Sequence, residues 1–182
     1  SGDINVLDIG TGSGCIAVAL AKYSPDFHVT ALDISHPALI IASQNAHVHQ
    51  VQNRVHLFQA DLRVPFPLLT NQSHRFDIIC SNPPYIPTQY LAKLPVSQFE
   101  PRNALDGGQA GIELMSALLP QAVLLLKQDG LFLMEIDSSY AEKAVSLTAE
   151  HFQGAVIQLK VDLAGKERLI VVENPNNYKS LS

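Results

Sequence analysis

The segment Ser81-Asn82-Pro83-Pro84-Tyr85-Ile86 places two hydrogen-bond acceptors side by side in a rigid turn. Asn82 offers a side-chain carbonyl, and Pro83 offers a main-chain carbonyl with no N–H beside it. Two acceptors that lie close together can bind both hydrogens of a planar NH2 group. The alternative is a proline-rich connector that only ends a strand, and an isolated Pro-Pro pair favours that alternative.

The residues before this turn predict where it lies in the fold. Phe76-Asp77-Ile78-Ile79-Cys80 is a short, almost uniformly apolar run, which is typical of a buried parallel strand, and the two prolines end it. Ligands bind at the carboxyl ends of the strands in open α/β sheets. The sequence therefore predicts a ligand site at this turn.

A second candidate site is the glycine loop Gly10-Thr11-Gly12-Ser13-Gly14. It lies between the apolar run 4–9, which contains Asp8, and the Ala-rich amphipathic run 15–22. Strand, glycine loop and helix in this order predict the first βα unit of a doubly wound sheet. Glycines let the chain turn tightly and let a ligand approach the backbone, and Ser13 is a candidate helix cap. The G-x-G-x-G spacing differs from the G-x-G-x-x-G dinucleotide fingerprint.

Two acidic residues follow the next predicted strands. Asp33 ends the strand predicted at 28–32, about twenty residues beyond the glycines, where a carboxylate can bind the hydroxyls of a ribose. Asp61 and Leu62 follow the strand predicted at 55–60. Asp61 could meet the base of a bound nucleoside while Leu62 packs on its face; the alternative for Asp61 is a helix or turn cap.

The remaining periodicity completes an α/β pattern. Ser35 is the expected cap of a helix that contains Pro37 and runs to about His49. His47 and His49 do not share a face of that helix, so no metal site is expected. Further elements are expected at 112–127 (a helix that Pro120 kinks or divides), 131–136 (strand), 140–151 (helix), and 155–161 and 168–172 (strands of a hairpin, hence one antiparallel strand at that edge).

Three segments lack such periodicity. Residues 65–74 are expected to connect into the strand at 76–80, and the tail from Asn174 is polar. Residues 82–111 form a long loop, and a loop of this length in a compact domain is usually functional.

Composition narrows the function classes. At 182 residues, with 47% hydrophobic and 16% charged residues, the chain fits one soluble domain. The net charge of -5 and the scattered Lys and Arg residues argue against a direct nucleic-acid partner. No apolar run approaches the roughly 18–20 residues of a membrane span, and no signal peptide is evident, so neither a membrane partner nor secretion is expected. Cys15 and Cys80 are interpreted as buried, reduced thiols.

Taken together, Val6 to Gly14, Asp33 and the Asn82-Pro83-Pro84-Tyr85 turn resemble the class I methyltransferases that use S-adenosylmethionine. In the long loop, Phe99-Glu100-Pro101-Arg102 and Ala104-Leu105-Asp106-Gly107-Gly108 resemble the signature of the HemK/PrmC family, the release-factor glutamine methyltransferases. The resemblance covers nearly the whole chain, through to Asp162-Leu163-Ala164-Gly165.

This resemblance implies a Rossmann-like fold over residues 1–173, with a polar tail at 174–182. The sheet is expected to be seven-stranded and mostly parallel, with one antiparallel edge strand and helices on both faces. The glycine loop is then expected to hold the methionine part of the cofactor, Asp33 the ribose, and Asp61 and Leu62 the adenine. The full expected cofactor set is Asp8, Gly10, Thr11, Gly12, Ser13, Gly14, Asp33, Asp61, Leu62 and Asn82.

The substrate in this family is the glutamine of the Gly-Gly-Gln loop of peptide-chain release factors. An amide nitrogen is a poor nucleophile because its lone pair is delocalised, and two acceptors on its hydrogens orient it and make it more electron-rich. Such positioning needs no general base, so no catalytic His or Lys is expected. The expected catalytic residues are Asn82, Pro83 and Tyr85, and the expected substrate-binding residues are Asn82, Pro83, Pro84, Tyr85 and Phe99.

Two of these assignments keep alternatives. Tyr85 either forms a wall of the substrate slot or is a packed aromatic residue that ends the strand. Phe99 is expected to close the site from above. Two features also depart from the family pattern: an N-terminal helical domain that helps to hold the release factor is not among these 182 residues, and Asp137 stands where most bacterial members have Gly, as in the mitochondrial branch.

Three other functions compete with methylation of a release factor. A sister group that shares the Asn-Pro-Pro-Tyr turn methylates glutamine in a ribosomal protein. Adenine or guanine methylation of nucleic acid is possible chemically, since an exocyclic NH2 group is also planar. A non-catalytic cofactor-binding module is the third. We expect a monomer in the bacterial cytoplasm or the mitochondrion.

Overall fold

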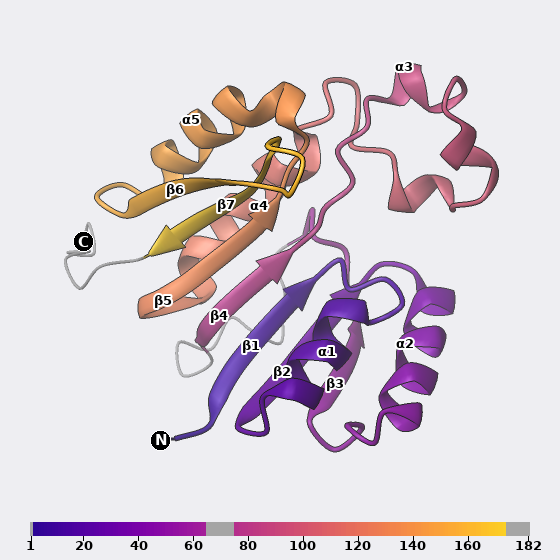
Figure 1. Cartoon of the computed structure of the whole chain (residues 1–182), viewed down its shortest axis with the longest axis vertical. Helices are drawn as coiled ribbons and strands as arrows, with labels where there is room; N and C mark the ends of the chain where they lie inside the picture. Colours follow the sequence, from indigo (N-terminus) through magenta and orange to yellow (C-terminus); the bar gives the residue numbers. More distant parts are fainter. Residues whose placement is uncertain (1, 65–74, 174–182) are drawn as a thin grey trace.

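The computed structural model describes residues 2–64 and 75–173. Seven strands form one sheet in the order β3-β2-β1-β4-β5-β7-β6 (Figure 1). The connector predicted at 65–74 and the tail predicted at 174–182 lie outside the described residues. The strands are β1 (Ile4–Ile9), β2 (Phe27–Asp33), β3 (Val55–Gln59), β4 (Phe76–Ser81), β5 (Leu126–Glu135), β6 (Val156–Val161) and β7 (Glu167–Glu173).

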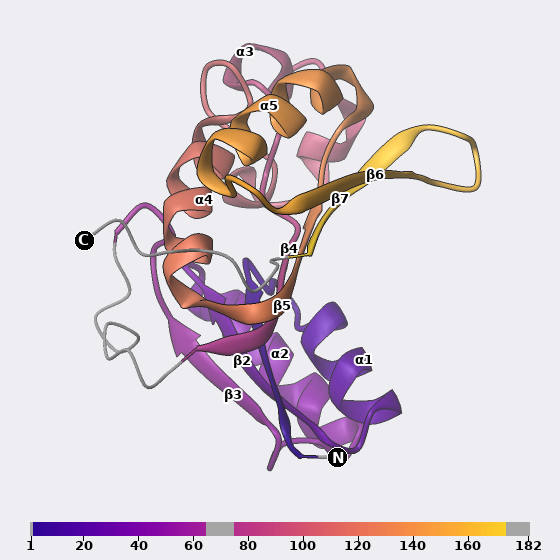
Figure 2. The same cartoon turned by 90° about the vertical axis from the view of Figure 1, so that its left-hand side faces the viewer.

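Helices cover both faces of this sheet, as predicted; Figure 2 shows α1 and α4 on opposite sides of it. The helices are α1 (Cys15–Tyr23), α2 (His36–Val48), α3 (Thr88–Leu91), α4 (Glu113–Leu125) and α5 (Ala141–His151). Alternate residues of a strand point to opposite faces, so β1 contributes to two cores. Val6 packs in the cluster that includes α1 and α2 residues, whereas Leu7 and Ile9 pack in the cluster that includes α4 and α5 residues.

The carboxyl-terminal part of the sheet contains the predicted hairpin. β7 pairs antiparallel with both β5 and β6. The antiparallel strand therefore lies one position in from the edge, and β6 is the edge strand. No helix in residues 2–64 or 75–173 is both long and apolar enough to cross a bilayer.

The boundary between α4 and β5 differs from the prediction. Pro120 lies within one helix and does not divide it, and this helix ends at Leu125 rather than at Lys127. β5 begins at Leu126, five residues earlier than expected, because Leu126 pairs with Phe76 before the register shifts and resumes at Leu131 and Ile78. Asp129, with φ of 60°, marks this irregular stretch. Such pairing depends on β4, about fifty residues earlier, and not on local periodicity.

Two local predictions were wrong, and one was confirmed. Gly14, in the left-handed conformation, is the N-cap of α1, while the Ser13 hydroxyl contacts the Cys15 sulfur at 3.3 Å. Cys15 is exposed because it begins α1 on its solvent side; Cys80 is buried as expected. The Ser35 hydroxyl accepts a hydrogen bond from the Ala38 N–H at 3.4 Å and caps α2, as predicted.

Candidate functional site

The glycine loop and the Asn82 turn meet at the carboxyl edge of the parallel strands. β1 and β4 are parallel neighbours, with Ile9 opposite Ser81. The Ser81 hydroxyl donates a hydrogen bond to the Ile9 carbonyl oxygen at 2.9 Å. A Cβ atom on Gly10 would lie 3.9 Å from the Asn82 carbonyl oxygen, so the two candidate sites are adjacent. The role of Ser81 was not predicted, since only the register of the two strands reveals it.

The glycine loop combines one tight contact with one open position. A Cβ atom on Gly14 would lie 3.0 Å from the Ala42 Cβ, so glycine lets the loop pack closely on α2. The Asn45 side chain, also on α2, donates to the Ser13 carbonyl oxygen at 2.9 Å. Gly12 has φ of 56°, and a Cβ there would meet no described atom within 4 Å. The loop is thus anchored to α2 and leaves space for a ligand at Gly12.

Asp8 lies beneath this loop with 1% of its surface exposed. Its carboxylate accepts a hydrogen bond from the Thr11 hydroxyl at 2.6 Å, and the Ala17 N–H in the first turn of α1 also favours its charged form through hydrogen bonding. Burial raises the pKa of Asp8 to about 6, and the nearby Asp33 carboxylate adds to the rise while these hydrogen bonds oppose it. Asp8 therefore shapes the loop from below rather than facing an open ligand space.

Asp33 is half-buried at the end of β2 and faces the loop. One carboxylate oxygen accepts the Gly12 N–H and the other accepts the Ser35 N–H, both at 2.8 Å. A carboxylate oxygen can accept two hydrogen bonds, so each oxygen of Asp33 retains one acceptor position. Two adjacent hydroxyl groups, as in a ribose, fit this pair of acceptors.

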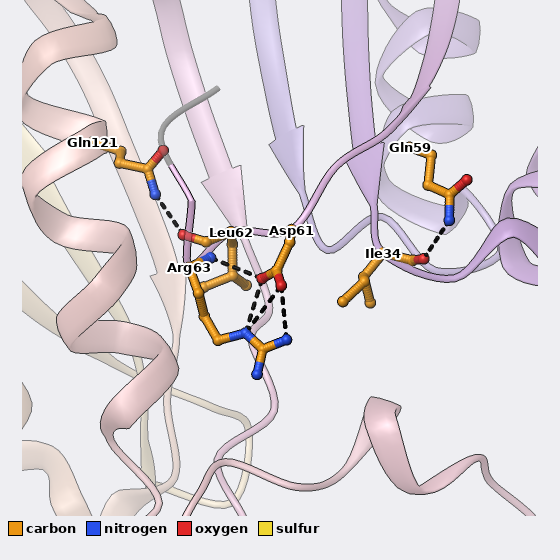
Figure 3. Close-up of polar contacts among 6 residues, drawn as sticks. All are labelled: Ile34, Gln59, Asp61, Leu62, Arg63 and Gln121. Atoms are coloured by element: carbon orange, nitrogen blue, oxygen red, sulfur yellow. Dashed lines mark hydrogen bonds and ion pairs between the residues drawn. The ribbon is translucent and has the colours of Figure 1, made fainter. Parts of the chain in front are cut away.

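Asp61 differs from Asp33 because the Arg63 side chain already binds both of its carboxylate oxygens. Figure 3 shows its carboxylate facing the Arg63 side chain, with Ile34 across from it. One oxygen accepts from the Arg63 N–H and Nε, both at 2.9 Å, and the other from Nε at 3.1 Å and Nη2 at 2.7 Å. Hydrogen bonds from Arg63 are the main cause that holds the pKa of Asp61 below its usual range.

Two glutamine side chains hold the backbone beside Asp61 (Figure 3). Gln121 on α4 donates a hydrogen bond to the Leu62 carbonyl oxygen. Gln59 donates to the Ile34 carbonyl oxygen at 3.0 Å. Ile34, directly after Asp33, is 44% exposed, and Leu62 is half-buried. Ile34 therefore leaves apolar surface open to solvent at this edge, whereas Leu62 packs partly against the core.

The Asn82 turn is held by a backbone brace from residues 105–111. Asn82 is exposed, Pro83 is buried, and Pro84 and Tyr85 are half-buried. Ile86 forms an isolated parallel bridge with Asp106: the Ile86 N–H donates to the Leu105 carbonyl at 3.1 Å, and the Gly107 N–H donates to the Ile86 carbonyl at 2.8 Å.

Glycine packing adds to this brace. A Cβ atom on Gly107 would lie 2.7 Å from the Tyr85 Cα, and one on Gly111 would lie 2.6 Å from the Tyr85 carbonyl oxygen. Asp106 accepts hydrogen bonds from the Thr88 hydroxyl at 2.6 Å and the Gly108 N–H at 3.1 Å, and the Thr88 bond is the main cause of its lowered pKa. The segment 104–108, which carries part of the family signature, thus supports the Asn82 turn.

The two aromatic residues assigned to the substrate lie in unlike environments. Burial raises the pKa of Tyr85 most, and the negative charge of Glu135 adds to the rise. Arg168 is close enough to Tyr85 to lower this pKa. Phe99 is 84% exposed, so it is not packed over the turn in this structure. The sequence did not predict Glu135 or Arg168 as site residues, because they come from β5 and β7.

Comparisons with known proteins agree with this geometry. Residues 2–98, which include both the glycine loop and the Asn82 turn, match the family described as "Methyltransferase small domain". A "Release factor glutamine methyltransferase" of Rhodopirellula baltica is 43% identical over 92% of this chain and 56% of its own length. One of Bacillus subtilis is 36% identical over 93% of this chain and 58% of its length. The chain spans a little over half the length of these curated relatives.

Two further similarities bear on substrate and fold. A "Ribosomal protein uL3 glutamine methyltransferase" of Francisella tularensis is 37% identical over 74% of this chain and 42% of its length. A methyltransferase structure from Pyrococcus furiosus has a TM-score of 0.68 at 18% identity, covering 96% of this chain and 76% of that chain, which supports the Rossmann-like fold. Because the family match spans more than half of its residues, the chain belongs to the methyltransferase small domain family.

Proposed function

We propose that this protein transfers a methyl group from S-adenosylmethionine to the side-chain amide nitrogen of the glutamine in the Gly-Gly-Gln motif of a peptide-chain release factor. One observation carries the proposal: a turn with two acceptors for a planar NH2 group is held beside the glycine loop by the bond from Ser81 to Ile9. The names of the relatives support the glutamine substrate.

The cofactor is assigned to the glycine loop, at the carboxyl edge of the parallel strands. The open position at Gly12 accommodates the methionine part, and the two remaining acceptor positions of Asp33 bind the ribose hydroxyls. Asp61 and Leu62 face the adenine. When bound, the cofactor supplies an electrophilic methyl group on a positively charged sulfur. The ionised Asp8 carboxylate beneath the loop favours a cation above it.

The methyl acceptor, which is the glutamine side-chain amide, is assigned to the Asn82 turn. The Asn82 side-chain oxygen and the Pro83 carbonyl oxygen accept the two amide hydrogens, which fixes the direction of the nitrogen lone pair. Positioning of this kind lowers the barrier without a general base. The N-methylated amide cation is strongly acidic, so its surplus proton leaves to water. Tyr85 and Pro84 border the slot, and Phe99, being exposed, is available to contact the surrounding polypeptide.

The test is methyl transfer from labelled S-adenosylmethionine to a purified release factor, with a Gln→Ala change in its Gly-Gly-Gln loop as control. We expect label on the unchanged factor and none on the control. In the enzyme, Asn82→Ala should abolish transfer while the cofactor affinity, measured by calorimetry, stays within a few-fold. Loss of transfer and cofactor affinity together would contradict the role of Asn82.

A ribosomal protein is the second candidate substrate, because one relative is named for that activity. Ribosomal protein and nucleic acid are therefore included in the same assay. Label on either, and none on the release factor, would overturn the release-factor assignment. A translation factor as substrate would place the enzyme in the bacterial cytoplasm or the mitochondrion.

A further inference from the structure

Two backbone segments border the position assigned to the adenine. One is residues 33–34, after β2, and the other is residues 61–62, after β3. The two strands are parallel neighbours with Asp33 opposite Gln59, and the Ala60 N–H donates to the Asp33 carbonyl oxygen at 2.9 Å. Beyond this bond the chain enters α2 on one side and a turn on the other. Both segments therefore leave the sheet at the point where a base would bind.

A glutamine side chain holds the first segment. Gln59, the last residue of the edge strand β3, donates a hydrogen bond from its side-chain amide to the Ile34 carbonyl oxygen at 3.0 Å (Figure 3). Ile34 is 44% exposed, so packing of its side chain alone would hold it weakly. The bond from Gln59 thus fixes the Ile34 backbone relative to β3.

A second glutamine holds the other segment from a different part of the fold. Gln121 on α4 donates from its side-chain amide to the Leu62 carbonyl oxygen. The same nitrogen also donates to the Ala117 carbonyl oxygen, one turn earlier on α4, at 3.3 Å. The Leu62 side chain packs against the core cluster that contains residues of α4. The helix therefore fixes both the backbone and the side chain of Leu62.

The two bonds have the same chemistry but come from different elements. Each joins a neutral amide donor to a main-chain carbonyl, so neither bond depends on the protonation of a titratable group. They tie Ile34 to β3 and Leu62 to α4, on either side of Asp61 in the view of Figure 3. A segment that is already fixed loses less freedom when a ligand binds to it than a mobile segment does. The two bonds therefore prepare this edge for a rigid, flat ligand group.

We propose that Gln59 and Gln121 are positioning residues that fix Ile34 and Leu62 as the two apolar contacts of the adenine base. This inference rests on the cofactor assignment of the proposed function. Each glutamine acts through the backbone carbonyl that it holds, not by contact with the base. Without its bond, the segment has to be ordered when the cofactor binds, and the affinity for the base falls. Asp33 keeps its own bonds in either case, so the ribose is bound as before.

The test compares two ligands, one with the base and one without it. S-adenosylhomocysteine carries adenine, whereas S-ribosylhomocysteine has a hydroxyl group in its place; calorimetry measures the first directly and the second by displacement of the first. In Gln59→Met and in Gln121→Met, the affinity for S-adenosylhomocysteine should fall about three- to tenfold, since each restraint is one hydrogen bond. The affinity for S-ribosylhomocysteine should stay unchanged. Equal losses for both ligands, or a loss for neither, would overturn the proposal.

Two further variants separate the hydrogen bond from side-chain size and from a general effect on the sheet. Gln121→Glu keeps the size but has no N–H as a carboxylate, so it should bind S-adenosylhomocysteine no better than Gln121→Met. Gln158 on β6, at the opposite edge of the sheet, donates to Glu173 at 3.2 Å, and Gln158→Met should leave both affinities unchanged. Wild-type affinity in Gln121→Glu, or a base-specific loss in Gln158→Met, would refute the proposal.

These binding measurements need no methyl acceptor, so they fail or succeed separately from the transfer assay. The base-specific loss, without transfer to release factor, ribosomal protein or nucleic acid, would refute the proposed function and leave the role of the two glutamines intact. Transfer by the wild type, with unchanged affinity for S-adenosylhomocysteine in both glutamine variants, would refute the positioning role and leave the proposed function intact.

Discussion

The two halves of the proposed site are held in opposite ways: the cofactor half is the glycine loop with Asp8, Asp33 and Asp61, and the acceptor half is the Asn82 turn. The cofactor half is fixed by hydrogen bonds to carboxylates around an open position at Gly12, and each oxygen of Asp33 keeps a spare acceptor position. The acceptor half is fixed by backbone packed on backbone, with Gly107 against Tyr85. One half has room and unused acceptors for a ligand; the other holds a turn whose shape must not change. Changes in the first should therefore alter affinity, and changes in the second should alter rate.

The largest expected effect comes from adding a side chain at Gly107, where the backbone brace of residues 105–111 packs against Tyr85. A Cβ in Gly107→Ala would lie 2.7 Å from the Tyr85 Cα and 2.8 Å from the Pro84 carbonyl oxygen, so the acceptor turn has to move. We expect transfer to fall at least about 100-fold, since a displacement of about 1 Å can cost that much. The unfolding free energy should fall by about 1–3 kcal/mol, measured by urea denaturation.

Cofactor affinity should stay within a few-fold in this variant, because the glycine loop is untouched. Gly2→Ala is the control: a Cβ there meets no described atom within 4 Å, and Gly2 lies just before β1, at the amino end of the parallel strands. A loss of cofactor affinity as large as the loss of rate in Gly107→Ala would show that the two halves are not independent.

Replacing Asp8 tests whether the buried negative charge beneath the glycine loop lowers the unfolding free energy of the protein. Its pKa is about 6 in the folded protein against an ordinary value of 3.8, so the unfolded chain gives up this proton at lower pH. Stability from this group is complete below about pH 4 and is lost as pH rises to about 6. Asp8→Asn has no proton to lose, and its unfolding free energy should exceed that of the wild type by about 3 kcal/mol at pH 7.5.

The same variant should bind the cationic cofactor more weakly at pH 7.5, since the buried negative charge is gone. Denaturation and calorimetry at pH 4 and 7.5 measure both effects, with the stability difference vanishing at pH 4. Equal destabilisation of Asp8→Asn at both pH values would mean that the hydrogen bond from Thr11 outweighs the cost of the buried charge.

Asp33 should separate affinity from rate. Asp33→Ala removes the acceptors for the ribose hydroxyls and the partner of the Gly12 N–H, so cofactor affinity should fall at least about tenfold. The rate at saturating cofactor should change little, because the acceptor turn is intact. Asp26→Ala, at the other end of β2, is the control. Unchanged affinity in Asp33→Ala would show that the ribose binds elsewhere.

Strands and their carboxyl ends could be predicted from the sequence because a buried parallel strand is a run of consecutive apolar residues. Ile4–Ile9 and Phe76–Ser81 are examples. The glycine loop, Asp33 and Asn82 follow such strands directly, which is why the structure brings them together. Such local patterns predicted the order of strands and helices, and the family resemblance predicted the seven-stranded, mostly parallel sheet, which the structure confirms.

Features that depend on distant pairing could not be predicted. The early start of β5 requires β4, and the charges of Glu135 and Arg168 reach Tyr85 from two strands that follow it by about fifty residues or more. The Asp106-Gly107 segment was singled out only by resemblance, and its physical reason, the lack of space beside Tyr85, is visible only in three dimensions. Local sequence patterns identify the residues at the end of a strand, but the register between neighbouring strands determines which of these residues are in contact.

The smallest expected effect concerns the two carboxylates of the cofactor half. Each oxygen of Asp33 accepts one hydrogen bond, whereas Asp61 accepts four from Arg63, so an adenine amino group has to displace the guanidinium to reach Asp61. Arg63→Met should therefore raise cofactor affinity about two- to threefold, the modest gain expected from losing an exposed competitor. Calorimetry with Asp61→Ala as the comparison measures this. Weaker binding in Arg63→Met would mean that Arg63 contacts the cofactor itself, and equal binding in both variants would mean that the adenine does not use Asp61.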